Sequence, residues 1–170
     1  MDKVKIEWGP NVVALDKAAE SNLAHLDENG FYAILSANLV QADDRRWGNF
    51  DLLYIGQAYD QTLRERLVQP HDAYSHISAE NKKTGKTAVV MVGIITAVST
   101  AKLTQDLVDD VEHCLIYSNQ PLCNDADKGE YKGRSLQITN SGGCFPLKEL
   151  SSCSAPKSQS AEKGTRETSG

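Results

Sequence analysis

A continuous apolar run from Thr87 to Val98 constrains the fold more than any other segment of this chain. The run is rich in Val and Ile, and apolar and polar residues do not alternate along it. Such a run is typical of a β-strand that is buried on both faces. We therefore expect this segment to lie inside a sheet rather than at its surface.

Two further segments predict a hairpin. Residues 31–37 and 51–56 are expected to be its strands, and the polar residues 41–49 are expected to connect them. Because side chains alternate along a strand, Leu53 is expected to face away from Tyr54. The sequence thus predicts Leu53 and Ile55 on one face of the second strand, and Leu52 and Tyr54 on the other.

Helical patterns surround these strands. Residues 11–28 look mainly helical, and Asp60 is expected to cap a short helix over residues 61–69. Further helices are predicted at residues 71–83 and, after a cap at Ser99 or Thr100, up to residue 118. A short strand is then expected at residues 135–139.

The composition indicates one folded domain with an appendage. The chain has 170 residues, of which 40% are apolar and 24% charged, enough to bury a core without disulfides or metal staples. The predicted organisation is an N-terminal extension over residues 1–28, a domain over residues 29–150 and a disordered polar tail over residues 151–170.

The expected location is cytoplasmic. The N-terminus lacks the pattern of a signal peptide, and the longest apolar stretch is far shorter than the roughly 20 residues that span a bilayer, so no membrane association is expected. The spacing of the cysteines does not match a zinc site, and four reduced thiols are the simplest interpretation. These cysteines are Cys114, Cys123, Cys144 and Cys153.

Three groups of polar side chains are candidates for chemistry. Tyr32 and Tyr54 lie on the two strands of the predicted hairpin, where they can lie side by side. Arg64 and Arg66 flank the apolar stripe of a short helix, so either could reach into a cleft. Glu112 lies in the apolar row of the long helix, where a carboxylate is costly unless it meets a metal or a cation. Solvated arginines and a glutamate that reaches out to solvent are the alternative interpretations.

Read in order, these motifs resemble the GIY-YIG nuclease family. Residues 30–32 (GFY) correspond to the first motif, and residues 54–56 (YIG) reproduce the second. Residues 63–67 (LRERL) follow at about the distance of the family's arginine helix. Residues 112–124 are similar to its glutamate helix and the Pro-x-x-Asn turn that follows. The resemblance covers residues 29–150.

The resemblance implies an α/β (α+β) fold, with a small, mainly antiparallel central sheet flanked by helices. It implies a metal-dependent endonuclease that hydrolyses phosphodiester bonds in nucleic acid, DNA more than RNA. Glu112 would bind Mg²⁺, or Mn²⁺, and a tyrosine would serve the attacking water. An arginine would neutralise phosphate charge; matching LRERL favours Arg66, and counting from the second motif favours Arg64. The implied catalytic residues are Tyr32, Tyr54, Arg64, Arg66, His71, Glu112 and Asn124.

The charge of the chain leaves a second function open. The formal net charge is -5, so a nucleic-acid site must be a local basic patch, for which Lys82, Lys83 and Lys86 are the candidates. Substrate choice would come from these lysines, from residues 41–49, or from a partner chain or second copy. The alternative is a catalytically weak domain of the same kind that binds nucleic acid or protein; the acidic charge and Gln57, where many relatives have Lys, favour it.

Overall fold

Seven strands form one curled sheet in the order β4-β3-β5-β1-β6-β7, with β2 paired to β5. The structure is a computed structural model, and it describes residues 1–41 and 46–156. Strands β1 and β6 run parallel, whereas the other pairs are antiparallel. A mixed α and β fold with a mainly antiparallel sheet is therefore confirmed. The strands are β1 (Asp2–Trp8), β2 (Val13–Ala14), β3 (Gly30–Gln41), β4 (Arg46–Ala58), β5 (Thr87–Val98), β6 (Leu136–Gly142) and β7 (Leu150–Cys153).

Strand β5 lies in the interior of the sheet, as its apolar run predicts. It pairs with β3 along one side and with β1 and β2 along the other. Its residues from Val89 to Val92 are at most 1% exposed, because an apolar cluster covers each face. The sheet is therefore organised around this strand.

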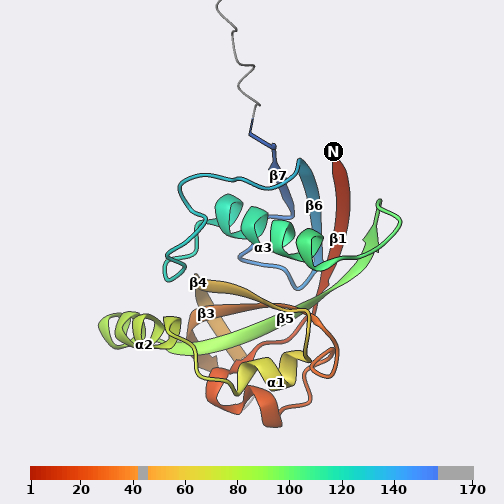
Figure 1. The fold of residues 1–170 in the computed structure, drawn as a ribbon. Coiled ribbons are helices and arrows are strands. Elements are labelled where there is room, and N and C mark those ends of the chain that lie inside the picture. The colour runs from red at the N-terminus through yellow and green to blue at the C-terminus, as the bar shows by residue number, and fades with distance from the viewer. Residues whose placement is uncertain (42–45, 157–170) are drawn as a thin grey trace, which may run out of the picture.

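The helices divide between the two faces of the sheet. Helix α3 (Gln105–Asn119) packs its buried row on one face, whereas α1 (Leu63–Leu67), α2 (Ala73–Thr84) and the 3-10 helix η1 (Leu15–Glu20) pack on the other. Figure 1 shows α3 above the sheet, with α1 and α2 below it. Any site that joins α3 to α1 must therefore reach around an edge of the sheet.

Two predicted helix starts are wrong by a few residues. Helix α1 is capped by Thr62 rather than Asp60, and the side chains of Thr62 and Glu65 form a reciprocal capping box. Helix α3 begins after Thr104, whose hydroxyl accepts a hydrogen bond from the Leu107 amide. In both cases the helix begins after the threonine whose side chain accepts a hydrogen bond from a free amide of the first turn, and not after the other nearby residues that could cap it.

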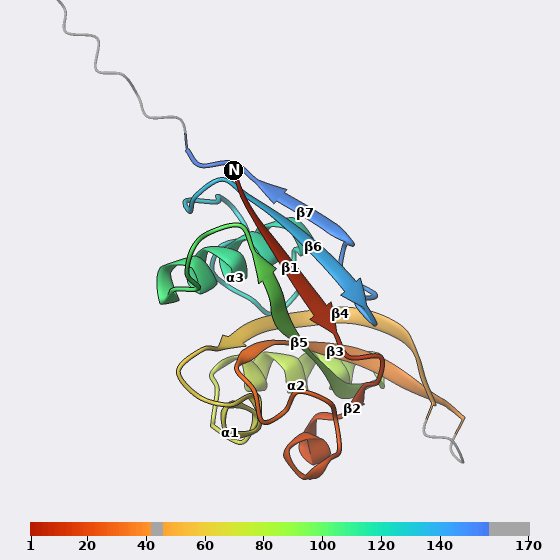
Figure 2. The ribbon, with the colours of Figure 1, turned by 90° about the vertical axis from the view of Figure 1, so that its right-hand side faces the viewer.

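The N-terminal residues belong to the sheet, so the predicted boundary between residues 28 and 29 cuts across it. Strand β1 pairs with β5 on one side and β6 on the other, and Figure 2 shows it crossing the middle of the sheet. Val4, Ile6 and Trp8 are buried and alternate with exposed polar residues. The mainly helical interpretation of residues 11–28 is also wrong, because only the short η1 is helical there.

The predicted hairpin is confirmed, but its strands are longer and carry a bulge. Ile34 pairs with Tyr54 and Leu35 pairs with Leu52, which leaves Leu53 as the extra residue. The bulge places Leu53 and Tyr54 against the same apolar cluster, contrary to simple alternation. Of the predicted connection, residues 46–49 belong to β4, and residues 42–45 lie outside the described residues.

The C-terminal end of the described chain is also ordered. Strand β7 pairs with β6, so the predicted tail is wrong for residues 151–153; residues 157–170 of that tail lie outside the described residues. Cys114 and Cys153 form a disulfide, which corrects the expectation of four reduced thiols, while Cys123 and Cys144 are free and buried. Over residues 1–41 and 46–156, no helix is both long and apolar enough to cross a membrane.

Candidate active site

Tyr32 and Tyr54 lie side by side on neighbouring strands. Their ring centroids are 6.0 Å apart, and Tyr32 is 1% exposed. Gly56 pairs with Tyr32 across the hairpin, and a Cβ atom at Gly56 would lie 2.4 Å from the Cζ atom of that ring. The glycine of the second motif thus makes room for the tyrosine of the first.

The two arginines of α1 point to different places. The Cζ atom of Arg66 lies 5.9 Å from the centroid of the Tyr32 ring, close enough for a cation–π contact. Arg64 instead pairs with Asp27 at 2.7 Å and donates to the carbonyl of Ala19. Arg66 is therefore the arginine beside the tyrosines, and Arg64 fastens α1 to the segment before β3.

His71 adds an imidazole to the tyrosine pair from the loop between α1 and α2. Its Nε2 atom lies 2.9 Å from the hydroxyl of Tyr54, and its Nδ1 atom accepts a hydrogen bond from the Ala73 amide at 3.0 Å. Burial and the nearby Arg66 lower the pKa of His71, which favours the neutral ring. Because Nδ1 accepts, the proton of the neutral ring resides on Nε2 and is donated to the Tyr54 oxygen.

Glu112 reaches this group from α3, on the other side of the sheet. The backbone amide of Gln57 on β4 lies close enough to favour the charged form of the Glu112 carboxyl. Burial, with smaller contributions from Asp109 and Asp127, raises the pKa of Glu112 to about 7, although the Gln57 amide and Arg66 oppose the rise. The site therefore holds a carboxylate that lacks a full counter-charge.

Asn124 holds the strand that carries Tyr54. Its side chain is buried, accepts a hydrogen bond from the Ile55 amide at 2.9 Å and donates to the Ile55 carbonyl at 3.0 Å. The Cys123 amide also donates to the Leu53 carbonyl at 2.7 Å. The turn after α3 therefore completes the outer edge of β4 at the bulge.

A cleft of about 650 Å³ opens beside Tyr54 and His71. Two exposed carboxylates, Asp72 and Asp125, line it, and His76 lies 3.9 Å from Asp125. The cleft is thus accessible but rimmed partly by negative charge. Its remaining lining residues are Ala73, Ser75, Asn124 and Ala126.

The tyrosines are weak acids in this environment. Burial is the main cause that raises the pKa of Tyr32 well above its usual value and the pKa of Tyr54 to about 12. Glu112 contributes to both increases, and Arg66 opposes them. Both phenols are therefore protonated at neutral pH. A further positive charge at the site would be needed for either phenol to lose its proton readily.

The three candidate lysines lie away from this cleft. Lys86 pairs with Asp51 at 2.5 Å, and Lys83 lies 3.8 Å from Glu80. Lys82 lines a separate groove of about 690 Å³ between α2 and the start of β5. The described lining of this cleft contains none of the three lysines, and it contains neither Arg66 nor Glu112.

Sequence reasoning missed three neighbours of the site. Asp109 lies one helical turn before Glu112 on the same side of α3, a spacing that could have revealed it. Asp127 lies in the loop after α3, and Tyr74 places its ring centroid 5.8 Å from that of His71. Nothing in the pattern around Asp127 or Tyr74 distinguishes them before the chain is folded.

Glu112 is a single carboxylate rather than part of a ready-made metal cage. Within the described residues, no group of three or more His, Cys, Asp or Glu side chains could hold a metal ion. Comparisons with known protein families, with curated proteins and with solved structures find no match to this chain. The functional argument therefore depends on the geometry of the site itself.

Proposed function

We propose that this chain is a metal-dependent endonuclease of the GIY-YIG type, which hydrolyses phosphodiester bonds in nucleic acid, with DNA as the favoured substrate. One observation carries the proposal: three separate segments bring charged or polar groups to the tyrosine pair, because Arg66 lies over the Tyr32 ring, His71 bonds the Tyr54 hydroxyl, and Glu112 is near enough to raise the pKa of both tyrosines. A phosphodiester repels anionic nucleophiles, so its hydrolysis needs a positive group at the phosphate and a group that accepts the proton of water.

Glu112 is the residue that would hold the divalent ion, Mg²⁺ or Mn²⁺. A buried carboxylate whose pKa is raised by neighbouring carboxylates gains from a cation, which supports this assignment. One carboxylate with several waters suits the way Mg²⁺ binds proteins. When bound, such an ion polarises the phosphate and stabilises negative charge.

The chain's own residues would bind the phosphate, act on the attacking water and keep the site in position. The guanidinium of Arg66 would bind a phosphate oxygen, because that of Arg64 is paired with Asp27. Tyr54 would orient or deprotonate the attacking water, because it lines the cleft whereas Tyr32 is buried. The Nε2–H group of His71 donates to the Tyr54 oxygen, which favours a negative charge there as the proton leaves. Asn124 keeps Tyr54 in position through the backbone of Ile55.

A catalytically weak binding domain is the second candidate. The acidic rim of the cleft and the net charge of -5 favour it, because phosphate contacts need basic side chains. Such a domain would bind nucleic acid or a protein without cleaving anything. A partner chain or a second copy would then supply the positive surface.

Plasmid cleavage with paired arginine variants tests the proposal. Supercoiled DNA is incubated with the wild-type chain, Arg66→Ala and Arg64→Ala, in Mg²⁺, Mn²⁺ or chelator. We expect metal-dependent cleavage that Arg66→Ala slows by tens to hundreds of fold, since one charge-assisted contact in a transition state contributes about 2–4 kcal/mol. Arg64→Ala is the matched control and should change the rate only slightly.

The outcomes separate the two candidates. DNA binding without cleavage in either metal would favour the weak binding domain. Equal, small effects of both arginine substitutions would remove Arg66 from the site and leave the nuclease proposal without its phosphate-binding group.

A further inference from the structure

A pocket of about 480 Å³ lies at the C-terminal end of α3, between the helix, the loop that follows it and β7. Lys128 and Lys148 line it, together with Tyr117, which is 39% exposed. The described lining of this lysine pocket contains no carboxylate, whereas Asp72 and Asp125 line the tyrosine cleft. The lysine pocket is therefore a local basic site on a chain whose net charge is -5.

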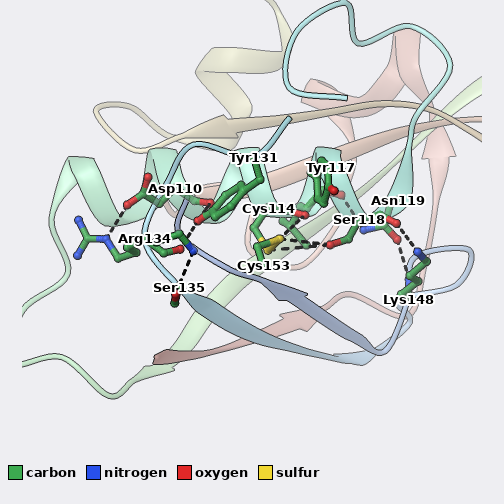
Figure 3. Close-up of a disulfide and its surroundings, with 12 residues drawn as sticks. Asp110, Cys114, Tyr117, Ser118, Asn119, Tyr131, Arg134, Ser135, Lys148 and Cys153 are labelled. Carbon is green, nitrogen blue, oxygen red and sulfur yellow. Dashed lines mark hydrogen bonds and ion pairs between the residues drawn. A yellow bond between two sulfur atoms is a disulfide. The ribbon is translucent and has the colours of Figure 1, made fainter. Parts of the chain in front are cut away.

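Both lysines are held in place by backbone carbonyls. The ammonium of Lys128 donates to the carbonyls of Pro121 and Leu122 at 3.2 and 3.3 Å, and that of Lys148 donates to the Ser118 carbonyl at the end of α3 (Figure 3). A carbonyl orients an ammonium but carries no net charge, so the positive charge of each lysine is not neutralised. Because an ammonium has three N–H donors, one donor of Lys128 and two of Lys148 remain for a ligand.

Other lysines of the chain are neutralised by carboxylates. Lys86 pairs with Asp51 at 2.5 Å, and Lys132 lies 3.5 Å from Glu130. The two lysines of the pocket form no such pair with any residue that the structure describes. The lysine pocket thus keeps positive charge that an anion could neutralise.

Ser151 adds an unpaired hydroxyl to the wall of this pocket. The residue is 1% exposed, and its Oγ atom has no hydrogen-bond partner within the described part of the chain. Along β7 it lies on the same side as Cys153, and the disulfide of Cys153 with Cys114 shows that this side faces α3. A buried hydroxyl without a partner reduces stability, and an anion in the pocket would accept its hydrogen bond.

The lysine pocket and the tyrosine cleft share a border, the loop of residues 120–129. Asn124 lines the tyrosine cleft, and Lys128 lines the lysine pocket. Ser118 follows Glu112 by six residues, which corresponds to about 9 Å along a helix. The phosphates of one strand of a DNA duplex repeat about every 3.4 Å along its axis, so this distance spans roughly two or three nucleotides.

We propose that the lysine pocket binds phosphate groups of the nucleic-acid backbone, roughly two or three nucleotides from the bond cleaved at Glu112. The proposal rests on the proposed function for the identity of the ligand. A phosphate offers only acceptors, which match the free N–H groups of Lys128 and Lys148 and the hydroxyl of Ser151. The partly exposed ring of Tyr117 gives a neighbouring sugar or base an aromatic surface. The pocket thereby supplies positive charge that the acidic rim of the tyrosine cleft lacks.

The test measures binding of a short DNA duplex by fluorescence anisotropy in chelator. Lys128→Gln/Lys148→Gln removes both charges and keeps amide donors for the carbonyls. Lys102→Gln/Lys132→Gln is the matched control, because it changes the net charge equally at two exposed lysines outside the pocket. The pocket variant should bind on the order of tenfold more weakly, and its salt dependence should fall by about two phosphate contacts. The control should change both only slightly.

Two further measurements separate a binding role from a structural one. Plasmid cleavage in Mg²⁺ by the pocket variant should show a raised KM and a nearly unchanged kcat, because its lysines bind the substrate away from the reacting phosphate. Acetylation of the wild type, followed by mass spectrometry, should show that bound duplex protects Lys128 and Lys148 but not Lys102 or Lys132. This last measurement does not depend on the folding of any variant.

Failure of the lysine pocket and failure of the nuclease proposal are distinguishable. Equal affinity and salt dependence in the pocket and control variants would overturn the pocket, and so would unprotected Lys128 and Lys148 or a wild type that binds no duplex. Cleavage by the wild type would then still support the nuclease. Weakened binding and protected lysines without cleavage in any metal would uphold the pocket and contradict the nuclease function.

Discussion

Two regions of the molecule lie on opposite sides of α3, and they differ in how completely their polar groups are paired. Around Tyr32 and Tyr54, ionisable side chains are buried with shifted pKa values and incomplete neutralisation. On the far side, Asp110 pairs with Arg134 at 2.6 Å, and the cross-link of Cys114 lies one turn further along the helix (Figure 3). The carboxylate of Asp110 in the second region is thus neutralised by a partner within the chain, whereas that of Glu112 in the first is not.

This difference supports the proposed placement of the ligand site at the tyrosine pair. Buried groups that keep a net charge reduce stability, and they persist where a substrate or ion completes them. Groups that are paired within the chain have their stabilising partners already. Four sets of measurements test whether the two regions differ in this way.

The largest effect is expected from two carboxylates of the same helix. Glu112→Ala should reduce metal-dependent cleavage on the order of a thousandfold, because the residue that would hold the ion is lost. Its free energy of unfolding should hold or rise, since a costly buried carboxylate disappears. Asp110→Ala is the matched control: it should keep cleavage and lose about 1–2 kcal/mol of stability with its Arg134 pair. Plasmid assays and urea unfolding measure both, and normal cleavage by Glu112→Ala would contradict the metal assignment.

The cross-link should dominate the stability of the second region. Closing a loop of this length lowers the entropy of the unfolded chain and contributes about 4 kcal/mol in the chain-entropy model. Urea unfolding of wild type with and without a dithiol reductant should show a loss of that order. Cys114→Ser/Cys153→Ser should be equally destabilised but insensitive to reductant. A wild type whose midpoint ignores the reductant would show that the region is stable without the bond.

The buried carboxylate of the first region predicts a pH dependence. Glu112 ionises near pH 4.5 in the unfolded chain and near pH 7 in the folded one, so the folded state binds more protons between these values. Its contribution to stability is therefore fully present below about pH 4.5 and is lost as the pH rises through about 7, amounting to about 3 kcal/mol. Unfolding in chelator across this range should show the fall, and Glu112→Gln should flatten it. An unchanged slope in that variant would assign the titration to another group.

The smallest effects are expected from two tyrosine hydroxyls. The hydroxyl of Tyr74 is buried and has no hydrogen-bond partner among the described residues, whereas that of Tyr131 donates to the Arg134 carbonyl at 2.6 Å. Tyr74→Phe should be neutral or stabilising, and Tyr131→Phe should destabilise by about 1 kcal/mol. Thermal unfolding of both variants gives the comparison. A clear loss of stability in Tyr74→Phe would mean that its hydroxyl is satisfied in solution.

The amino-acid sequence determined the elements whose signals are local. The apolar run of β5, the β3–β4 hairpin and the helix that bears Glu112 all follow from residue patterns within one segment. The neighbouring positions of Tyr32 and Tyr54 follow as well, because a hairpin places its two strands in contact. The alternation of Val4, Ile6 and Trp8 is an equally local signal for β1.

Tertiary structure decided the features that depend on contacts between distant segments. Arg64 and Arg66 flank the same apolar stripe symmetrically, so only Asp27 and the Tyr32 ring distinguish them. The bulge at Leu53 reverses the alternation that the strand pattern predicts. Pairing of Cys114 with Cys153 requires that α3 and β7 come together, and no spacing between cysteines encodes it. A one-dimensional pattern specifies which face of an element is buried, and the packed neighbour decides what each remaining side chain meets.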